Sequence, residues 1–402
     1  MMAFLQNAPL YVVPFLLVIT VIITIHELGH FLTARAFGVA VDRFSIGFGP
    51  TLVSWRDKGG VEWRVGALPL GGYVRFAGDE NVASVPDGDD LDTLRAHIVA
   101  REGAGAEKKY LHFKPLWQRA LIVAAGPLAN FALAIVLFTL FFGIFGEQVT
   151  SNRIAAVTPG GSAQKAGFQV GDVVLAADGR KITSFEDLQF YVQYRAGVPI
   201  VFQVQRGAQT LELTGAPAVA SAPGPTGTTQ TIGRMGLMAR GSKLVKHNPV
   251  ETAGLAFKRT WDVSATTLYY LGRIVTGHVP SNQIGSFVGI AHETGDLTKH
   301  AIDSAHGDHI NVATAIAFTM IQLVAFLSIS VGLLNLMPVP VLDGGHLLFY
   351  AYESIARRPV SANIQAAGYR VGLALLLGLM LFATWNDLQG LRVFHFLGGL
   401  IS

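Results

Sequence analysis

Four long apolar stretches constrain this chain more than any other feature of its sequence. They cover residues 8–25, 120–145, 313–336 and 371–384. About 20 apolar residues cross the hydrocarbon core of a bilayer, and Arg370 can extend the short last stretch by reaching the interface. A content of 51% hydrophobic and 14% charged residues also differs from that of soluble proteins. The sequence therefore predicts a multi-pass α-helical membrane protein with four transmembrane helices.

The first stretch could alternatively be a cleaved signal peptide. No Lys or Arg precedes it and no clear small-residue cleavage site follows it, so we expect an uncleaved helix. Lys and Arg gather before the second stretch and between the last two. The positive-inside rule then predicts that residues 36–118 and 351–370 are cytoplasmic, while residues 146–312 and both termini lie on the other side.

The composition excludes several kinds of function. With no cysteine, the chain has no disulfide, no thiol nucleophile and no Cys-type zinc site, so a metal must be held by His, Asp or Glu. The net charge is +3 and the basic residues are scattered, which gives no support for nucleic acid binding.

The segment between the first two stretches has two parts. Residues 39–78 alternate between apolar and polar, which predicts strands, with Gly59-Gly60 and Gly71-Gly72 as hairpin turns. This β-region is apolar enough to touch the membrane. Residues 79–109 are acidic, rich in Gly and aperiodic, so we expect a mobile insertion without a chemical role.

The segment between the second and third stretches begins as a small α/β module. Residues 150–215 contain strand-like runs and a helix that Ser184 caps. Residues 216–231 predict a linker or long loop, and residues 232–238 a closing strand. Residues 251–275 predict an amphipathic helix that lies against the membrane or the module.

His26, Glu27 and His30 form an HExxH sequence at the end of the first stretch. The spacing places both imidazoles on one helix face, as in many zinc sites, and Glu27 can reach the same metal. Ionisable groups within a bilayer cost ~2.5–3.5 kcal/mol and are rarely kept there without a partner. The alternative is that these side chains simply reach from the helix end to the interface.

A catalytic zinc ion usually has three protein ligands and one open position. Asp343 follows the third stretch on the predicted cytoplasmic side, at a depth similar to that of His30. It is our candidate for the third ligand. Two alternatives are that Asp343 caps a helix starting near Gly344, and that His346 is the third ligand.

Several motifs occur together in one order over nearly the whole chain. They are HELGH at 26–30, Gly126-Pro-Leu-Ala-Asn130, the α/β module, which resembles a PDZ domain, and Asn335-x-x-Pro338-x-x-x-Leu342-Asp343-Gly344. Together they resemble the site-2 protease family, in particular its bacterial RseP-type intramembrane zinc metalloproteases. One departure is that this chain has room for about one PDZ domain, where RseP carries two.

The resemblance implies that His26, His30 and Asp343 bind Zn²⁺ and that Glu27 is the general base. Asn335 and Asn130 would bind the substrate backbone or stabilise the oxyanion, with hydrogen bonding between helices as the alternative. The β-region would hold an unwound substrate by strand addition, or be a purely structural hairpin. The substrate-binding candidates there are Val61, Trp63, Val65, Gly71, Gly72 and Tyr73.

The expected architecture has seven segments. They are transmembrane helix 1 with HExxH (1–36), a cytoplasmic-side membrane-associated β-sheet with the mobile insertion (37–118), transmembrane helix 2 (119–146), a periplasmic PDZ-like α/β domain (147–240), a periplasmic amphipathic helical segment (241–311), transmembrane helix 3 with NxxPxxxLDG (312–346), and a cytoplasmic turn with transmembrane helix 4 (347–402).

By this resemblance, the chain is a zinc-dependent endopeptidase of the bacterial inner membrane. It would cut transmembrane segments of single-pass proteins after their ectodomains have been trimmed, in regulated intramembrane proteolysis. Anti-sigma factors and signal-peptide remnants are the expected substrate types, and the PDZ-like module either excludes bulky ectodomains or binds peptide C-termini. The alternatives are a non-catalytic PDZ membrane scaffold and a metal transporter. A transporter needs ionisable residues along its path, and the second and fourth stretches contain almost none.

Overall fold

The computed structural model describes residues 2–78, 88–223, 229–278, 285–308 and 311–390. The chain forms two compact units. The first combines Met1–Phe138 with Ile290–Phe382, and the second combines Thr139–Gly289 with Ala383–Ser402.

Among the described residues, four helices are long and apolar enough to cross a membrane. They are α1 (Met2–Ala36), α3 (Leu116–Phe145), α8 (Val312–Asn335) and α10 (Ala362–Gly390). They coincide with the four apolar stretches, so the prediction of four candidate transmembrane helices is confirmed. The orientation of the chain across the membrane stays a prediction.

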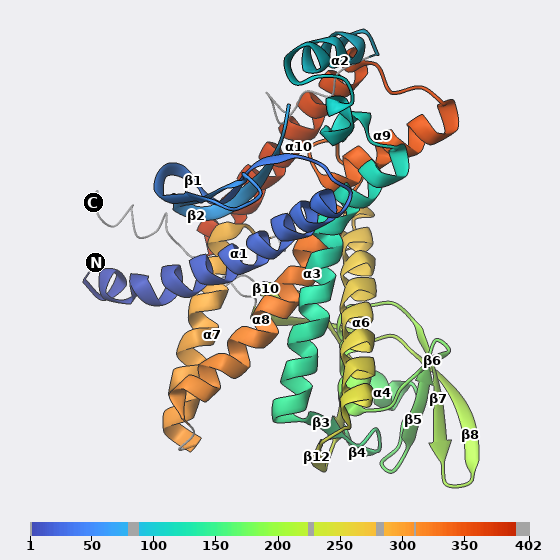
Figure 1. The fold of residues 1–402 in the computed structure, drawn as a ribbon. Coiled ribbons are helices and arrows are strands. Elements are labelled where there is room, and N and C mark those ends of the chain that lie inside the picture. Colours follow the sequence, from blue (N-terminus) through green and yellow to red (C-terminus); the bar gives the residue numbers. More distant parts are fainter. Residues whose placement is uncertain (1, 79–87, 224–228, 279–284, 309–310, 391–402) are drawn as a thin grey trace, which may run out of the picture. The chain divides into compact units, whose positions relative to one another are not determined.

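Helices α1, α3 and α8 pack together within the first unit (Figure 1). Val18 and Ile22 of α1 are buried against Leu323 and Val324 of α8. A Cβ atom on Gly29 of α1 would lie only 2.3 Å from a backbone oxygen of α3. Small residues allow such a close approach of two helices, and here the approach brings the HExxH turn against α3.

The chain after α1 forms β1 (Val41–Arg56) and β2 (Glu62–Phe76). The turn between them contains Gly59 and Gly60, as predicted. The prediction of a second turn at Gly71-Gly72 is wrong, because both residues lie inside β2. These glycines serve close packing instead: a Cβ atom on Gly71 would lie 2.1 Å from the Phe48 ring.

The two long strands bend so that parts of them pair twice. Phe44 of β1 pairs with both Trp63 and Val74 of β2, and Trp63 also pairs with Trp55. The first half of β2 therefore has partners on both sides. Within the described residues, positions 72–76 pair on one side only and form an edge of the sheet.

The prediction that residues 79–109 form a mobile, aperiodic insertion is wrong for its second part. Residues 88–102 form α2 (Gly88–Glu102), and the 3₁₀ helices η1 (Ala106–Lys109) and η2 (Leu111–Phe113) follow. Leu91, Leu94 and Ile98 share a helical spacing, and Ile98 is buried, which accounts for the helix. Residues 79–87 lie outside the described part of the chain.

The third predicted segment, 312–346, contains the end of one helix and the start of the next. Helix α8 ends at Asn335, and α9 (Asp343–Ala356) begins after a turn that contains two prolines. The turn is tight, since a Cβ atom on Gly344 would lie 2.3 Å from the backbone oxygens of Leu336 and Met337. Glycine at this position allows α9 to start directly beside the end of α8.

The second unit contains an α/β core around a four-stranded sheet in the order β6-β5-β7-β8 (Figure 1). Apolar side chains of this sheet and of α5 share one buried cluster, and Ser184 caps α5 as predicted. The elements are β5 (Val173–Ala177), β6 (Arg180–Lys181), β7 (Ile200–Arg206), β8 (Gln209–Gly215), α4 (Ser162–Lys165) and α5 (Phe185–Gln193). Two further strand pairs join β3 (Glu147–Thr150) to β12 (Ser242–Val245) and β4 (Ile154–Val157) to β11 (Leu237–Ala239).

The predicted linker at 216–231 is instead largely a strand pair. It consists of β9 (Ala218–Pro223) and β10 (Thr229–Arg234), and residues 224–228 lie outside the described part. The predicted amphipathic helix is confirmed as α6 (Pro249–Val275), which exposes Phe257 and Trp261 on one face. Helix α7 (Phe287–Asp308) completes the predicted helical segment.

Candidate metal centre

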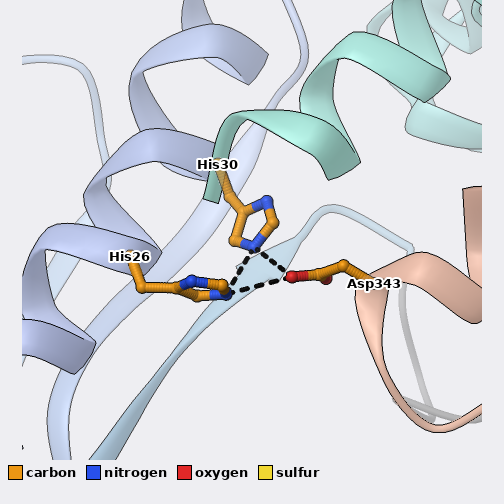
Figure 2. Close-up of side chains that lie close together, drawn as sticks. All are labelled: His26, His30 and Asp343. Atoms are coloured by element: carbon orange, nitrogen blue, oxygen red, sulfur yellow. Dashed lines mark hydrogen bonds and ion pairs between the residues drawn. The ribbon is translucent and has the colours of Figure 1, made fainter. Parts of the chain in front are cut away.

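Three side chains converge in the first unit from segments more than 300 residues apart. Figure 2 shows His26 and His30 of α1 pointing toward Asp343 at the start of α9. Asp343 Oδ2 lies 3.1 Å from Nε2 of His26 and 3.6 Å from Nε2 of His30. The two Nε2 atoms are 3.2 Å apart. His26 is buried, and the side chains of His30 and Asp343 are 12% and 19% exposed.

These spacings fit a tetrahedral zinc ion. Zinc bonds to imidazole nitrogen and carboxylate oxygen of ~2.0–2.2 Å place neighbouring ligand atoms about 3.3–3.6 Å apart. The sides of the triangle formed by the three atoms are 3.1, 3.2 and 3.6 Å, close to that range. Within the described residues, Asp343 Oδ2 is also buried without a hydrogen bond of good geometry, as expected of an atom that serves a metal.

The second nitrogen of each histidine ring contacts α3. His30 Nδ1 lies 2.8 Å from the backbone oxygen of Ile122, and His26 Nδ1 lies 3.3 Å from the side-chain amide of Asn130. Between these two contacts lies Gly126, where a Cβ atom would be 2.2 Å from His30 Nε2 and 2.8 Å from His26 Nε2. Helix α3 therefore forms one wall of the centre and contacts both rings.

Glu27 lies beside the three converging side chains, on the same turn of α1. Its carboxylate faces the backbone amide of Val74 in β2. A Cβ atom on Gly72 would lie 3.4 Å from Glu27 Cγ. The edge of the sheet at 72–76 therefore runs directly past this carboxylate.

The two alternatives for the third ligand are not supported. The N-cap of α9 is Leu342, and Asp343 is the first helical residue, whose carboxylate lies near the two histidines. His346 lies one turn further along α9 and contacts the Tyr369 hydroxyl at 3.0 Å. The group of side chains positioned to hold a metal ion contains Asp343 and not His346.

The remaining predicted site residues fall into different environments. Asn335 is the partly exposed last residue of α8, whereas Asn130 is completely buried. Val61 is buried in an apolar cluster beneath the sheet. Trp63 and Val65 have strand partners on both sides and so offer no free edge.

The other three candidates, Gly71, Gly72 and Tyr73, lie in the second half of β2. Gly72 and Tyr73 belong to the free edge at 72–76, next to Glu27. Sequence reasoning missed Ile122, since a backbone carbonyl carries no signal in the residue type. Gly126 stood in a recognised motif, but its closeness to two ring nitrogens follows only from the packing of α1 on α3.

Two histidines and an aspartate around a tetrahedral metal position, with a glutamate beside them and apolar helices around them, define an intramembrane metalloprotease. The model of peptidase family M50 matches residues 14–379, and the chain belongs to this family, the site-2 proteases. It is accordingly a zinc-dependent metalloprotease of a membrane.

Relatives support this assignment over nearly the full length. The chain is 49% identical to "Metalloprotease MmpA" of Caulobacter vibrioides, covering 97% of this chain and 98% of the relative. It is 40% identical to "Putative zinc metalloprotease Atu1380" of Agrobacterium fabrum, covering 95% and 96%. Identity to "Putative zinc metalloprotease Cj1068" of Campylobacter jejuni is 32%, over 93% and 92%.

Proposed function

We propose that His26, His30 and Asp343 hold the catalytic zinc ion and that Glu27 is the general base. The observation that carries this assignment is the triangle of ligand atoms, whose sides of 3.1, 3.2 and 3.6 Å are close to the edges of a zinc tetrahedron. A bound zinc ion supplies a Lewis acid that polarises the scissile carbonyl and acidifies a water molecule. Glu27 takes the proton of the attacking water and then donates it to the leaving amide nitrogen.

We propose that the substrate is bound as an added strand at the 72–76 edge of β2. A transmembrane helix has all its peptide groups paired, so a segment must unwind before it can be cut. An unwound segment then needs new partners for its backbone, and an open strand edge provides them with little demand on sequence. The edge runs past Glu27, which would place the bound backbone at the reacting groups.

This proposal assigns the substrate contacts to Gly72, Tyr73 and Val74 in place of the wider set from 61 to 73. Exposed apolar side chains elsewhere on the sheet, such as Leu52, Leu68 and Leu70, support its contact with the membrane. Asn335 at the end of α8 remains a candidate for contact with the substrate backbone.

We further propose that the substrates are single-pass membrane proteins already trimmed outside, of the anti-sigma-factor or signal-peptide-remnant type. The α/β core of the second unit would be a single PDZ-like domain on the periplasmic side. Its antiparallel sheet and capped helix support that reading. The metal centre would lie near the cytoplasmic side of a bacterial inner membrane, because basic residues flank α3 and α9 there.

The test is cleavage of a tagged single-pass substrate in liposomes by the parent, Glu27→Gln and Asp343→Asn, with zinc content measured on each. Glu27→Gln should keep zinc and lose cleavage by a factor of about 100 or more, since general-base catalysis contributes that much. Asp343→Asn and a zinc chelator should remove both zinc and cleavage. Parental cleavage by Glu27→Gln would refute the assigned base, and full zinc content in Asp343→Asn would refute the ligand set.

A further inference from the structure

Asn130 of α3 is completely buried beside the metal centre. Its side-chain nitrogen Nδ2 lies 3.3 Å from Nδ1 of His26. Within the described residues, its side-chain oxygen Oδ1 is buried without any hydrogen-bond partner. This unpaired oxygen does not decide the orientation of the amide, because the exchanged orientation leaves the nitrogen unpaired in the same place; the contact with His26 decides it.

Half a turn about the Cβ–Cγ bond exchanges the amide oxygen and nitrogen without moving any other group. Oδ1 then accepts a hydrogen bond from the Nδ1–H of His26. In the opposite arrangement the amide donates to Nδ1, and a neutral ring carries its proton on Nε2. Nε2 is the atom that faces His30 and Asp343, and a protonated nitrogen cannot bind a metal ion.

His30, on the same face of α1, shows the same arrangement with a partner whose role is unambiguous. Its Nδ1 lies 2.8 Å from the backbone oxygen of Ile122, and a carbonyl only accepts hydrogen bonds. The His30 proton is therefore on Nδ1, and Nε2 is free. Ile122, Gly126 and Asn130 follow one another at a spacing of four, so one stripe of α3 contacts both histidines.

We propose that Asn130 is a positioning residue: its amide oxygen accepts the Nδ1–H of His26 and thereby orients Nε2 toward the metal. This inference rests on the proposed ligand set. It replaces the expected contact of Asn130 with the substrate, because the residue is 0% exposed. A partner of this kind fixes both the tautomer and the orientation of a metal-binding histidine.

The experiment measures zinc affinity of the purified full-length protein in detergent, without substrate, by competition with a chromogenic chelator. Asn130→Leu and Asn130→Ala remove the acceptor and should weaken zinc binding roughly 10- to 100-fold, the usual effect of losing such a partner. Asn130→Asp keeps an acceptor and should stay within about threefold of the parent. Since no substrate is present, a role in binding substrate would leave every affinity unchanged.

Ser328→Ala is the matched control. Ser328 of α8 donates a hydrogen bond of 2.9 Å to the backbone oxygen of Asn130, so its loss perturbs the packing around the same residue without touching the amide. This variant should bind zinc like the parent. Gel filtration and circular dichroism establish folding, and if Asn130→Leu misfolds, the smaller Asn130→Ala carries the comparison.

Two outcomes overturn the inference: parental affinity in a folded Asn130→Ala, or an Asn130→Asp variant as weak as the alanine variant. His26→Ala separates this result from the ligand assignment. If His26→Ala keeps parental affinity, the ligand set itself is wrong. If it loses zinc while Asn130→Ala does not, only the role of Asn130 is refuted.

Discussion

Gly126 contributes no side chain, yet it sets the volume of the metal centre. A Cβ atom there would lie 2.2 Å from His30 Nε2 and 2.8 Å from His26 Nε2, closer than real Cβ contacts allow. In Gly126→Ala, at least one ring must therefore move from its ligand position. We expect zinc affinity to fall roughly tenfold or more, comparable to the loss of a group that orients a ligand, and cleavage to fall with it.

Gly143→Ala on the same helix is the control, since a Cβ atom there meets nothing within 4 Å. It should retain both zinc and activity. If a folded Gly126→Ala variant binds zinc with parental affinity, the two rings can accommodate the Cβ atom and the prediction is wrong. The sequence indicates the three ligands of Figure 2 because His and Asp are residue types that bind metals. It does not indicate Gly126, whose role depends on the packing of a second helix.

At the scale of elements, the edge of β2 makes a prediction about substrate binding. The amide of Val74 faces Glu27, away from β1, so proline at this position removes an outward N–H without removing a bond to β1. Losing one hydrogen bond of about 0.5–1.5 kcal/mol to the substrate should raise KM about twofold to twelvefold. Val74→Ala keeps the amide and should behave as the parent.

Steady-state kinetics on a model substrate separates two effects of Val74→Pro. Loss of strand addition raises KM and leaves kcat nearly unchanged, because that contact exists before the chemical step. A fall in kcat would report the loss of the contact between the Val74 amide and Glu27, which the proline also removes. An unchanged KM would contradict substrate binding at this edge.

The same elements show how far sequence patterns reach. Apolar length alone identified the four long helices, because a bilayer imposes a minimum length on any helix that crosses it. The break between α8 and α9 agrees with an apolar stretch that ends at residue 336 and with a helix start near Gly344. The continuation of β2 through Gly71 was not predicted, since it depends on contacts with residues distant in sequence. Helix α2 was not predicted because its few apolar residues at helical spacing lie in a segment rich in acidic residues.

At the scale of the whole molecule, the orientation across the membrane determines which substrates can reach the metal centre. The positive-inside rule predicts that the β1–β2 turn is cytoplasmic and that the α/β core of the second unit is on the opposite side. A substrate whose ectodomain has been removed would then expose little to that core. The reversed orientation would present the same core to cytoplasmic domains and would exclude a role in sensing trimmed ectodomains.

The absence of cysteine allows this orientation to be measured without background labelling. Lys58→Cys lies in the exposed β1–β2 turn, and Lys165→Cys lies at an exposed position of α4. In intact spheroplasts, a membrane-impermeant maleimide should label Lys165→Cys at once and Lys58→Cys only after permeabilisation. The parent should never react. If Lys58→Cys is labelled in intact spheroplasts and Lys165→Cys is not, the predicted topology is wrong and the chain has the opposite orientation. The assignment of the metal centre would be unaffected, but prior trimming of ectodomains could no longer define the substrates.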